Sequence, residues 1–276
     1  MQVKRLHEWN LTTKQATELQ RQMAGEVSRV NHVSNPRLVA GVDMSANRTR
    51  QTATAAVVVL SFPDLELVET QVVEGKLEFP YVPGLLSFRE IPLTLSACER
   101  LTNAPDLVIV DGQGIAHPRR MGLASHLGLC LDTPTIGCAK SLFIGTYEVP
   151  EQEAGSWSSI VDAGETVGAA LRTKTAVKPV FVSIGHMVDL PSAIHWVLEC
   201  RKGHRLPEPS RMAHLASKAD HASKQDSKQS VKVPTLEDWA KAKERRHKKQ
   251  ENIPFIQKLR ILDKMRQNAI NTGHNE

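Results

Sequence analysis

Four consecutive aliphatic residues, Leu107 to Val110, lead directly into Asp111 and a glycine-rich turn. An uninterrupted apolar run of this length is typical of a strand that is buried on both faces, as the central parallel strands of α/β proteins are. A carboxylate at the C-terminal end of such a strand lies at the sheet edge where open α/β folds bind ligands. The alternative is that Asp111 only caps a following helix, and this segment alone leaves both interpretations open.

A second strand also ends on a carboxylate. Residues 37–45 are largely apolar up to Asp43, and two further strands, 53–60 and 65–73, follow after short turns. Strands joined in this way form an antiparallel meander. Helical and strand patterns then alternate along the chain, which predicts one mixed α/β domain.

The remaining sequence gives further expectations for local structure. Apolar spacing predicts a helix over 11–31, and Pro92 predicts a break in the helix expected over 85–101. Residues 149–164 are polar, with Trp157 as a solitary anchor. The other predicted elements are helices over 119–131, 190–200 and from 206 onward, and strands over 107–110, 134–140, 165–172 and 179–184.

The positive charge of the chain is concentrated in its C-terminal part. From residue 218 onward there are fourteen Lys or Arg against eight Asp or Glu, whereas the preceding residues carry 21 against 22. Composition therefore predicts a globular domain over 1–219 and, over 220–276, a basic linker followed by a helical or partly disordered tail. A basic tail suits a polyanionic partner, with solvated disorder as the ordinary alternative.

Composition also excludes several classes of protein. The N-terminal residues lack the apolar core of a signal peptide, and no segment approaches the roughly 18 apolar residues of a membrane span. Four cysteines form neither a CxxC pair nor a metal-ligand spacing, which predicts buried free thiols in a reducing compartment. We therefore expect a cytoplasmic protein without a membrane partner, and a monomer because no long apolar surface is evident.

Several residues could share a site with Asp111. If the strands that end at Asp43 and Asp111 are parallel neighbours, their carboxylates meet at one edge of the sheet. Glu90 lies on the helix between them, and His214 lies on a late helix that could close the site. Grouped carboxylate oxygens predict a Mg²⁺ site, with Mn²⁺ as the substitute ion, and the chemistry that such a site serves is phosphodiester hydrolysis.

Two basic residues extend this group. Lys140 ends the next predicted strand and could place positive charge beside a phosphate oxygen. His117 follows the glycine-rich turn and is placed to orient water or a phosphate. Taken singly, each of these residues has an ordinary interpretation as a turn, helix-surface or core residue, so the predicted site depends on their joint placement.

A proline-bracketed loop supplies a second functional signal. Tyr81 and Val82 lie between Pro80 and Pro83, and Tyr81 is one of only two tyrosines in the chain. A rigid aromatic side chain outside the sheet is suited to insertion between stacked bases. The alternative is ordinary packing of Phe79 and Tyr81 against the core.

These motifs, taken together, resemble those of the endonuclease V family in order and spacing across residues 10–217. The matching segments are Gly41–Asp43, Pro80–Glu90, Asp111–Arg119, Gly122–Gly128, Gly137–Ser141 and Arg205–His214. The resemblance implies a ribonuclease-H-like fold: a mixed sheet of three antiparallel strands followed by parallel strands, flanked by helices, here with a basic C-terminal extension. It also implies a Mg²⁺-dependent DNA-repair endonuclease that acts on deoxyinosine. Members of that family cut the second phosphodiester 3′ to the lesion and leave 3′-hydroxyl and 5′-phosphate ends.

The resemblance also assigns roles to individual residues. The residues that match the metal site are Asp43, Glu90, Asp111 and His214, and those that match positions beside the scissile phosphate are His117 and Lys140. The residues that match the wedge between the DNA strands are Pro80, Tyr81, Val82 and Pro83. The candidates for the pocket that holds a flipped hypoxanthine are Gly84, Leu85, Gly112 and Gly122.

Some alternatives remain open at this point. Inosine-containing RNA could be the substrate, because no residue reveals whether a 2′-hydroxyl is required. Another ribonuclease-H-like nuclease would share the carboxylates but would not need the proline-bracketed loop. A lesion-binding protein without activity would be expected to lack a carboxylate, and none is missing. This sequence departs from the family pattern in two ways. Val82 replaces the isoleucine that is commoner in the wedge, which is a minor change. The Trp157 region and the residues beyond Ala219 have no counterpart in the family pattern.

Overall fold

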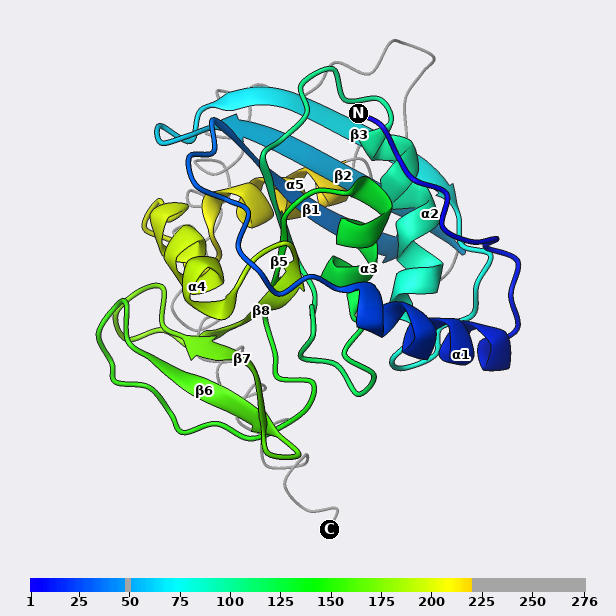
Figure 1. Cartoon of the computed structure of the whole chain (residues 1–276). Helices are drawn as coiled ribbons and strands as arrows, with labels where there is room; N and C mark the ends of the chain where they lie inside the picture. Colours follow the sequence, from blue (N-terminus) through cyan, green and yellow to red (C-terminus); the bar gives the residue numbers. More distant parts are fainter. Residues whose placement is uncertain (48–50, 220–276) are drawn as a thin grey trace, which may run out of the picture. The chain divides into compact units, whose positions relative to one another are not determined.

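The computed structural model describes residues 1–47 and 51–219, which form an eight-stranded mixed sheet with helices on both faces (Figure 1). The strand order is β3-β2-β1-β4-β5-β8-β7-β6. The strands are β1 (Leu38–Asn47), β2 (Thr52–Ser61), β3 (Leu67–Lys76), β4 (Leu107–Val110), β5 (Thr135–Ala139), β6 (Trp157–Asp162), β7 (Glu165–Leu171) and β8 (Val180–His186). The helices are α1 (Thr13–Met23), α2 (Leu86–Cys98), α3 (Leu123–Leu131), α4 (Leu190–Glu199) and α5 (Glu208–Ala219), with a short 3₁₀ helix over Ala24–Glu26. The predicted basic tail, 220–276, lies outside the described residues.

The centre of the sheet has the predicted topology. β1, β2 and β3 form the antiparallel meander, and β4 lies between β1 and β5 and runs parallel to both. The register pairs Val42 with Val110 across β1 and β4. Because parallel strands end at the same edge of a sheet, the residues that follow Val42 and Val110 are brought together there.

The second half of the sheet differs from the predicted succession of parallel strands. β8 pairs antiparallel with β5, β7 with β8, and β6 with β7. Ala163 and Gly164 join β6 to β7 with φ values of 51° and 80°, and two positive φ values define a tight hairpin turn that forces antiparallel pairing. Trp157, predicted to be a solitary anchor, is the first residue of β6. This segment looked polar because alternate residues of an edge strand face solvent.

Three helices differ from the sequence-based expectation: α1 ends earlier, α2 is unbroken and α3 begins later. α1 ends at Met23, well before residue 31. α2 passes through Pro92 without a break, because its buried face, which includes Ile91, packs against β2 and β3 and outweighs one missing backbone hydrogen bond. α3 begins at Leu123 because Arg120, with φ of 56°, ends a turn in the left-handed region that cannot belong to an α-helix.

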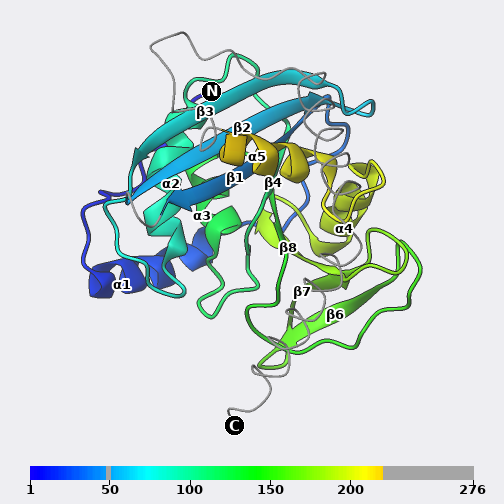
Figure 2. The ribbon, with the colours of Figure 1, turned by 180° about the vertical axis from the view of Figure 1, so that it is seen from behind.

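The core lies on both faces of the sheet, and β4 contributes to both. Leu107 and Ile109 pack in the cluster that includes α4 and α5, whereas Val108 and Val110 pack in the cluster that includes α2 and α3. Figure 2 shows α5 lying across β1 and β2 on one face, with α2 and α3 behind the sheet. The aliphatic run Leu107–Val110 is therefore a strand buried on both faces, as predicted.

The cysteines are all buried and free, which confirms the prediction of free thiols. Burial raises the pKa of Cys98, Cys130 and Cys200 to about 12, so their thiols stay protonated and unreactive at neutral pH. Within residues 1–47 and 51–219, no helix is both long and apolar enough to cross a membrane.

Candidate active site

Asp43 and Asp111 lie side by side at one edge of the sheet. Asp43 is in β1, Asp111 follows β4, and the Asp111 N–H donates to the Val42 carbonyl at 3.0 Å. One ligand atom each from Asp43, Asp111 and His214 can be chosen so that all three lie within 4.8 Å of one another. The carboxylates therefore converge, as the two strand ends suggested, and the helix-cap interpretation of Asp111 is no longer needed.

Helix α5 brings His214 to this edge because β1 and α5 touch through a glycine. A Cβ built on Gly41 would lie 1.9 Å from the carbonyl oxygen of Pro209, in the first turn of α5. Only a residue without a side chain permits such a close approach. The contact places His214 Nδ1 3.3 Å from Asp43 Oδ2.

Ser217 is a site residue that the sequence reading missed. Its hydroxyl donates to Asp43 Oδ2, and its side chain is buried. Residues three apart on a helix share a face, so the spacing from His214 to Ser217 was a usable signal once His214 was suspected. Ser217 fixes the orientation of the Asp43 carboxylate.

Glu90 in α2 lies near enough to Asp43 and Asp111 to feel their charges, but it is not one of the three residues whose ligand atoms lie within 4.8 Å of one another. Burial, together with the nearby charges of Asp43 and Asp111, raises the pKa of Glu90 to about 8. Burial and the contact with Asp43 also raise the pKa of Asp111 to about 6, against the opposing effect of Lys140. These pKa values are raised because negative charges crowded together repel one another, and a bound divalent cation would offset that repulsion. Hard oxygen donors are the ligands that Mg²⁺ and Mn²⁺ prefer.

The raised pKa of Glu90 gives a pH-dependent prediction for the metal-free protein. The native state holds the Glu90 proton up to about pH 8, whereas an unfolded chain releases it near 4.5, the ordinary pKa of a glutamate side chain. Stability is therefore lost as pH rises from 4.5 to 8. In the presence of EDTA, Glu90→Gln is expected to be more stable than the wild type by roughly 1–2 kcal/mol at pH 8.5, with the difference vanishing towards pH 4.5.

Urea unfolding at several pH values measures this difference. Glu99→Gln, which removes an exposed carboxylate at the end of α2, is the matched control and should not reproduce the trend. A Glu90→Gln protein that gained nothing in stability at high pH would show that Glu90 is not under electrostatic strain in the metal-free site.

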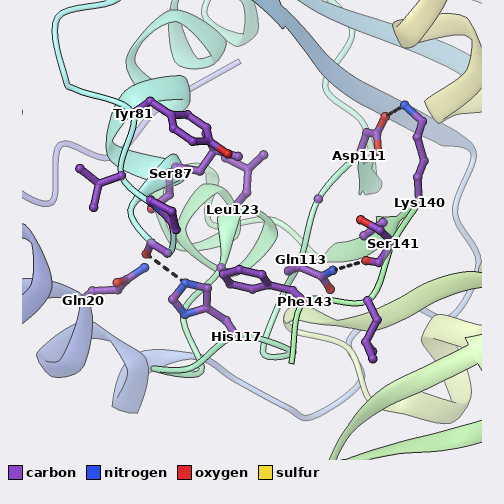
Figure 3. Close-up of a pocket in the computed structure, with 18 residues that line it drawn as sticks. Gln20, Tyr81, Ser87, Asp111, Gln113, His117, Leu123, Lys140, Ser141 and Phe143 are labelled. Carbon is purple, nitrogen blue, oxygen red and sulfur yellow. Dashed lines mark hydrogen bonds and ion pairs between the residues drawn. The ribbon is translucent and has the colours of Figure 1, made fainter. Parts of the chain in front are cut away.

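Lys140 follows β5 and reaches the same carboxylates. Its ammonium group forms an ion pair with Asp111, drawn as a dashed line in Figure 3, and lies 3.3 Å from His214 Nδ1. Burial and the charge of Lys140 lower the pKa of His214, which keeps the imidazole neutral, as a metal ligand must be. The backbone carbonyl of Lys140 accepts a hydrogen bond from Arg205 at 2.7 Å, which fixes the end of β5.

A pocket of about 410 Å³ adjoins this group (Figure 3). Asp111, which belongs to the acidic group formed by Asp43, Asp111 and His214, also lines the pocket. Lys140, which is paired with Asp111, lines it as well. The volume falls within the range of small-molecule sites. The other lining residues include Gln20, Ser87, Gln113, His117, Leu123, Ser141 and Phe143.

Three of the four predicted pocket residues line this cavity. Gly84, Gly112 and Gly122 are in its wall, whereas the side chain of Leu85 packs in a core cluster with Phe88, and Leu86 lines the pocket instead. The pocket residue is Leu86 instead of Leu85 because Leu85, at the N-cap position of α2, turns its side chain into the core. Phe143, which is partly exposed at the pocket, was missed although it lies only two residues beyond the Gly137–Ser141 motif, because nothing in the local sequence indicates that its side chain faces the pocket.

The proline-bracketed loop forms the rim of the pocket. Tyr81 is 68% exposed, so the alternative of packing against the core does not apply to it. Phe79 does pack inside, next to Phe88. Val82 and Pro83 also line the pocket, while Pro80 is exposed outside the lining.

His117 has a setting that differs from the predicted one. It is 4% exposed, its Nε2 lies 3.0 Å from the Gly84 carbonyl, and its Nδ1 accepts from the Arg119 N–H at 3.1 Å. Burial and the nearby arginines lower the pKa of His117 to about 4, so the ring is neutral. Both ring nitrogens are thus engaged by the protein itself.

Fold and site together define a class of protein. A mixed sheet with helices on both faces and carboxylates at the ends of adjacent parallel strands is the arrangement of a ribonuclease-H-like nuclease. A pocket adjoins the carboxylates, and the exposed Tyr81 stands at its rim.

Comparison with known proteins identifies the family. The family model described as Endonuclease V matches residues 21–215. Endonuclease V of Dehalococcoides mccartyi is 51% identical over 217 residues, which is 79% of this chain and 97% of the relative. Endonuclease V of Gloeobacter violaceus is 53% identical over 212 residues, 76% of this chain and 86% of the relative. The chain belongs to the endonuclease V family.

Solved structures agree with this assignment. The crystal structure of endonuclease V from Streptomyces avermitilis is 41% identical and superposes with a TM-score of 0.75, covering 80% of this chain and 98% of that one. Ciona intestinalis endonuclease V, solved with DNA that contains an inosine followed by a ribo-adenosine, is 31% identical with a TM-score of 0.66, covering 76% and 98%. The predicted family and fold are confirmed.

Proposed function

We propose that this protein is a DNA-repair endonuclease that recognises deoxyinosine and cuts the DNA beside it. The observation that carries the proposal is the shared wall between the pocket and the acidic group, formed by Asp111 and Lys140. A base held in the pocket has its own phosphodiester backbone within reach of that group. Inosine pairs weakly, so its extrusion from a duplex costs little.

The residues of the acidic group fit a divalent metal, for which we propose Mg²⁺, with Mn²⁺ as a substitute. Asp43, Asp111 and His214 would hold it, with Glu90 contributing from α2. When bound, such an ion activates water and stabilises charge on the scissile phosphate. Ser217 and Lys140 orient the two carboxylates, and Lys140 adds positive charge beside the phosphate.

Tyr81 would act as the wedge. Its exposed ring stands at the pocket rim, supported by Val82 and Pro83, where it can replace the stacking that the extruded base loses. The cut proposed is at the second phosphodiester 3′ to the lesion, with 3′-hydroxyl and 5′-phosphate ends and the base left in place. The Ciona relative, crystallised with inosine-containing DNA, supports the substrate class.

Two labelled duplexes test this proposal, one of them with a central deoxyinosine, each incubated with Mg²⁺ and mapped for the cut position. We expect one cut, in the inosine strand only. Equal cutting of both duplexes, or of neither, would contradict the proposal. A cut at another phosphodiester would preserve the substrate and correct the position.

Inosine-containing RNA is the second candidate substrate. The specific observation in its favour is that the Ciona complexes contain a ribo-adenosine directly after the inosine. An RNA strand with one inosine, assayed in parallel with the DNA, decides between the two. Faster cutting of the RNA would make the protein an endoribonuclease.

The basic tail is proposed to increase affinity for duplexes regardless of sequence. Removing residues 220–276 is expected to weaken binding of an unmodified duplex and to flatten its salt dependence, because each phosphate contact adds about 0.9 to the slope of log K against log salt. Fluorescence anisotropy at several salt concentrations measures both quantities. An unchanged slope would exclude phosphate contacts by the tail. Sedimentation of the full chain tests the accompanying expectation that the protein is a monomer.

A further inference from the structure

The carbonyl group of Gly84 joins the two walls of the pocket. It accepts one hydrogen bond from His117 Nε2 at 3.0 Å and a second from Arg119 Nη2 at 2.7 Å. Gly84 ends the rim loop that carries Tyr81, whereas His117 and Arg119 belong to the loop between β4 and α3. In Figure 3 a dashed line from His117 marks its hydrogen bond to Gly84.

The tautomer of His117 is fixed by its neighbours. Because Nδ1 accepts from the Arg119 N–H, the ring proton resides on Nε2 and is donated to Gly84. The ring needs no further partner and faces little solvent. His117 therefore belongs to the wall of the pocket rather than to the group that would contact the scissile phosphate.

Arg119 is in turn held by Gln20, a residue of α1. Arg119 Nε donates to Gln20 Oε1 at 2.5 Å, and Gln20 Nε2 donates to the Met121 carbonyl at 2.5 Å. Gln20 is 1% exposed; its bond to the Met121 carbonyl is buried, and its bond from Arg119 is partly buried. A buried polar side chain keeps its place only when its hydrogen bonds are satisfied, so the three residues hold one another in a single arrangement.

We propose that Gln20, His117 and Arg119 are positioning residues that set the width of the pocket by fixing Gly84. This inference rests on the proposed function, because the pocket matters only if it receives an extruded base. The brace, meaning these three side chains, anchors the rim loop to α1, which contributes no carboxylate to the site. Gly84 itself has a φ of 79°, and a Cβ built on it would lie 2.8 Å from Arg119 Nη2, so the fit is close.

The brace acts on binding rather than on bond cleavage. Its three side chains form no hydrogen bond or ion pair with Asp43 or Glu90, whereas Gly84 and Gln20 line the pocket. Loosening it should displace the rim loop and Tyr81 while leaving the acidic group in place. The expected result is a higher KM for the inosine duplex with little change in kcat.

The test uses two variants of the full chain. Gln20→Met keeps the side-chain volume and removes both hydrogen bonds, and Arg119→Lys keeps the charge but loses the planar fork that reaches Gln20 and Gly84 together. Each is expected to raise KM about tenfold, the scale of one lost charge-assisted hydrogen bond, with kcat within about threefold of the wild type. Gln22→Met, on the exposed face of α1, is the matched control.

Hydrogen exchange of the DNA-free protein gives a readout independent of activity. In both variants we expect faster exchange confined to residues 82–88, with protection in β4 unchanged. Gln20→Glu, which retains an acceptor for Arg119, should recover most of the affinity. Faster exchange throughout the sheet, or normal exchange at 82–88, would overturn the brace. Failure of the wild type to cut the inosine duplex would instead refute the proposed function and leave the exchange result interpretable.

Discussion

Asp43→Asn is expected to reduce cleavage of an inosine-containing duplex by roughly 10³-fold or more, equivalent to about 4 kcal/mol of transition-state stabilisation. The substitution keeps the shape of the side chain but removes the charge that faces His214 and the hydroxyl of Ser217. It leaves the pocket and Tyr81 unaltered, because Asp43 is not among the lining residues. Binding of the duplex should therefore persist while cutting is lost.

Single-turnover cleavage and anisotropy binding, measured on the same preparation, separate these two effects. Asp64→Asn, in the exposed turn after β2, is the control and should cut normally. A metal titration adds a second criterion, since the variant should need more Mg²⁺ or Mn²⁺ for any residual activity. Cleavage by Asp43→Asn within tenfold of the wild type would remove this residue from the metal-binding set.

Gly41→Ala is expected to destabilise the protein and to inactivate it together. The added methyl group would lie 1.9 Å from the Pro209 carbonyl oxygen and 2.1 Å from its carbonyl carbon, and both are backbone atoms of α5. The helix has to shift, and it carries His214 and Ser217 away from Asp43 as it does so. Overpacking on this scale costs about 3 kcal/mol, which corresponds to a fall in Tm of roughly 6–12 °C for a domain of this size.

Thermal unfolding and cleavage assays on Gly41→Ala test both parts. Gly25→Ala supplies the control, because nothing lies within 4 Å of a Cβ built there. Wild-type stability in Gly41→Ala would mean that α5 does not rest on β1 as closely as described. Wild-type stability with lost activity would separate the placement of His214 from the packing of the helix.

The sequence was most informative where local pattern and chemistry coincide. Asp43 and Asp111 could be paired in advance because each ends an apolar strand, and parallel strands share an edge. The family motifs then supplied the fold around them. Residues 157–162 could not be recognised as a strand from composition, because an edge strand with one solvated face buries few side chains.

Contacts between distant segments were beyond a reading of local pattern. Nothing near Gln20 in the sequence indicates that its amide reaches Arg119, 99 residues away. The pocket contribution of Phe143 and the inward turn of Leu85 likewise depend on tertiary packing, which spacing along the chain does not encode. The sequence also carried no sign that both ring nitrogens of His117 would have partners within the protein, the Gly84 carbonyl and the Arg119 N–H.

The position of α5 at the end of the described domain has a consequence for synthesis on the ribosome. Asp43 and His214 are separated by 171 residues, and α5, the helix that carries His214, is the last described element to be translated. A nascent chain that has emerged only as far as β8 can pair its strands but lacks His214 and Ser217. Since domains complete their packing only when all their elements are available, nuclease activity should first arise after release of α5 from the exit tunnel.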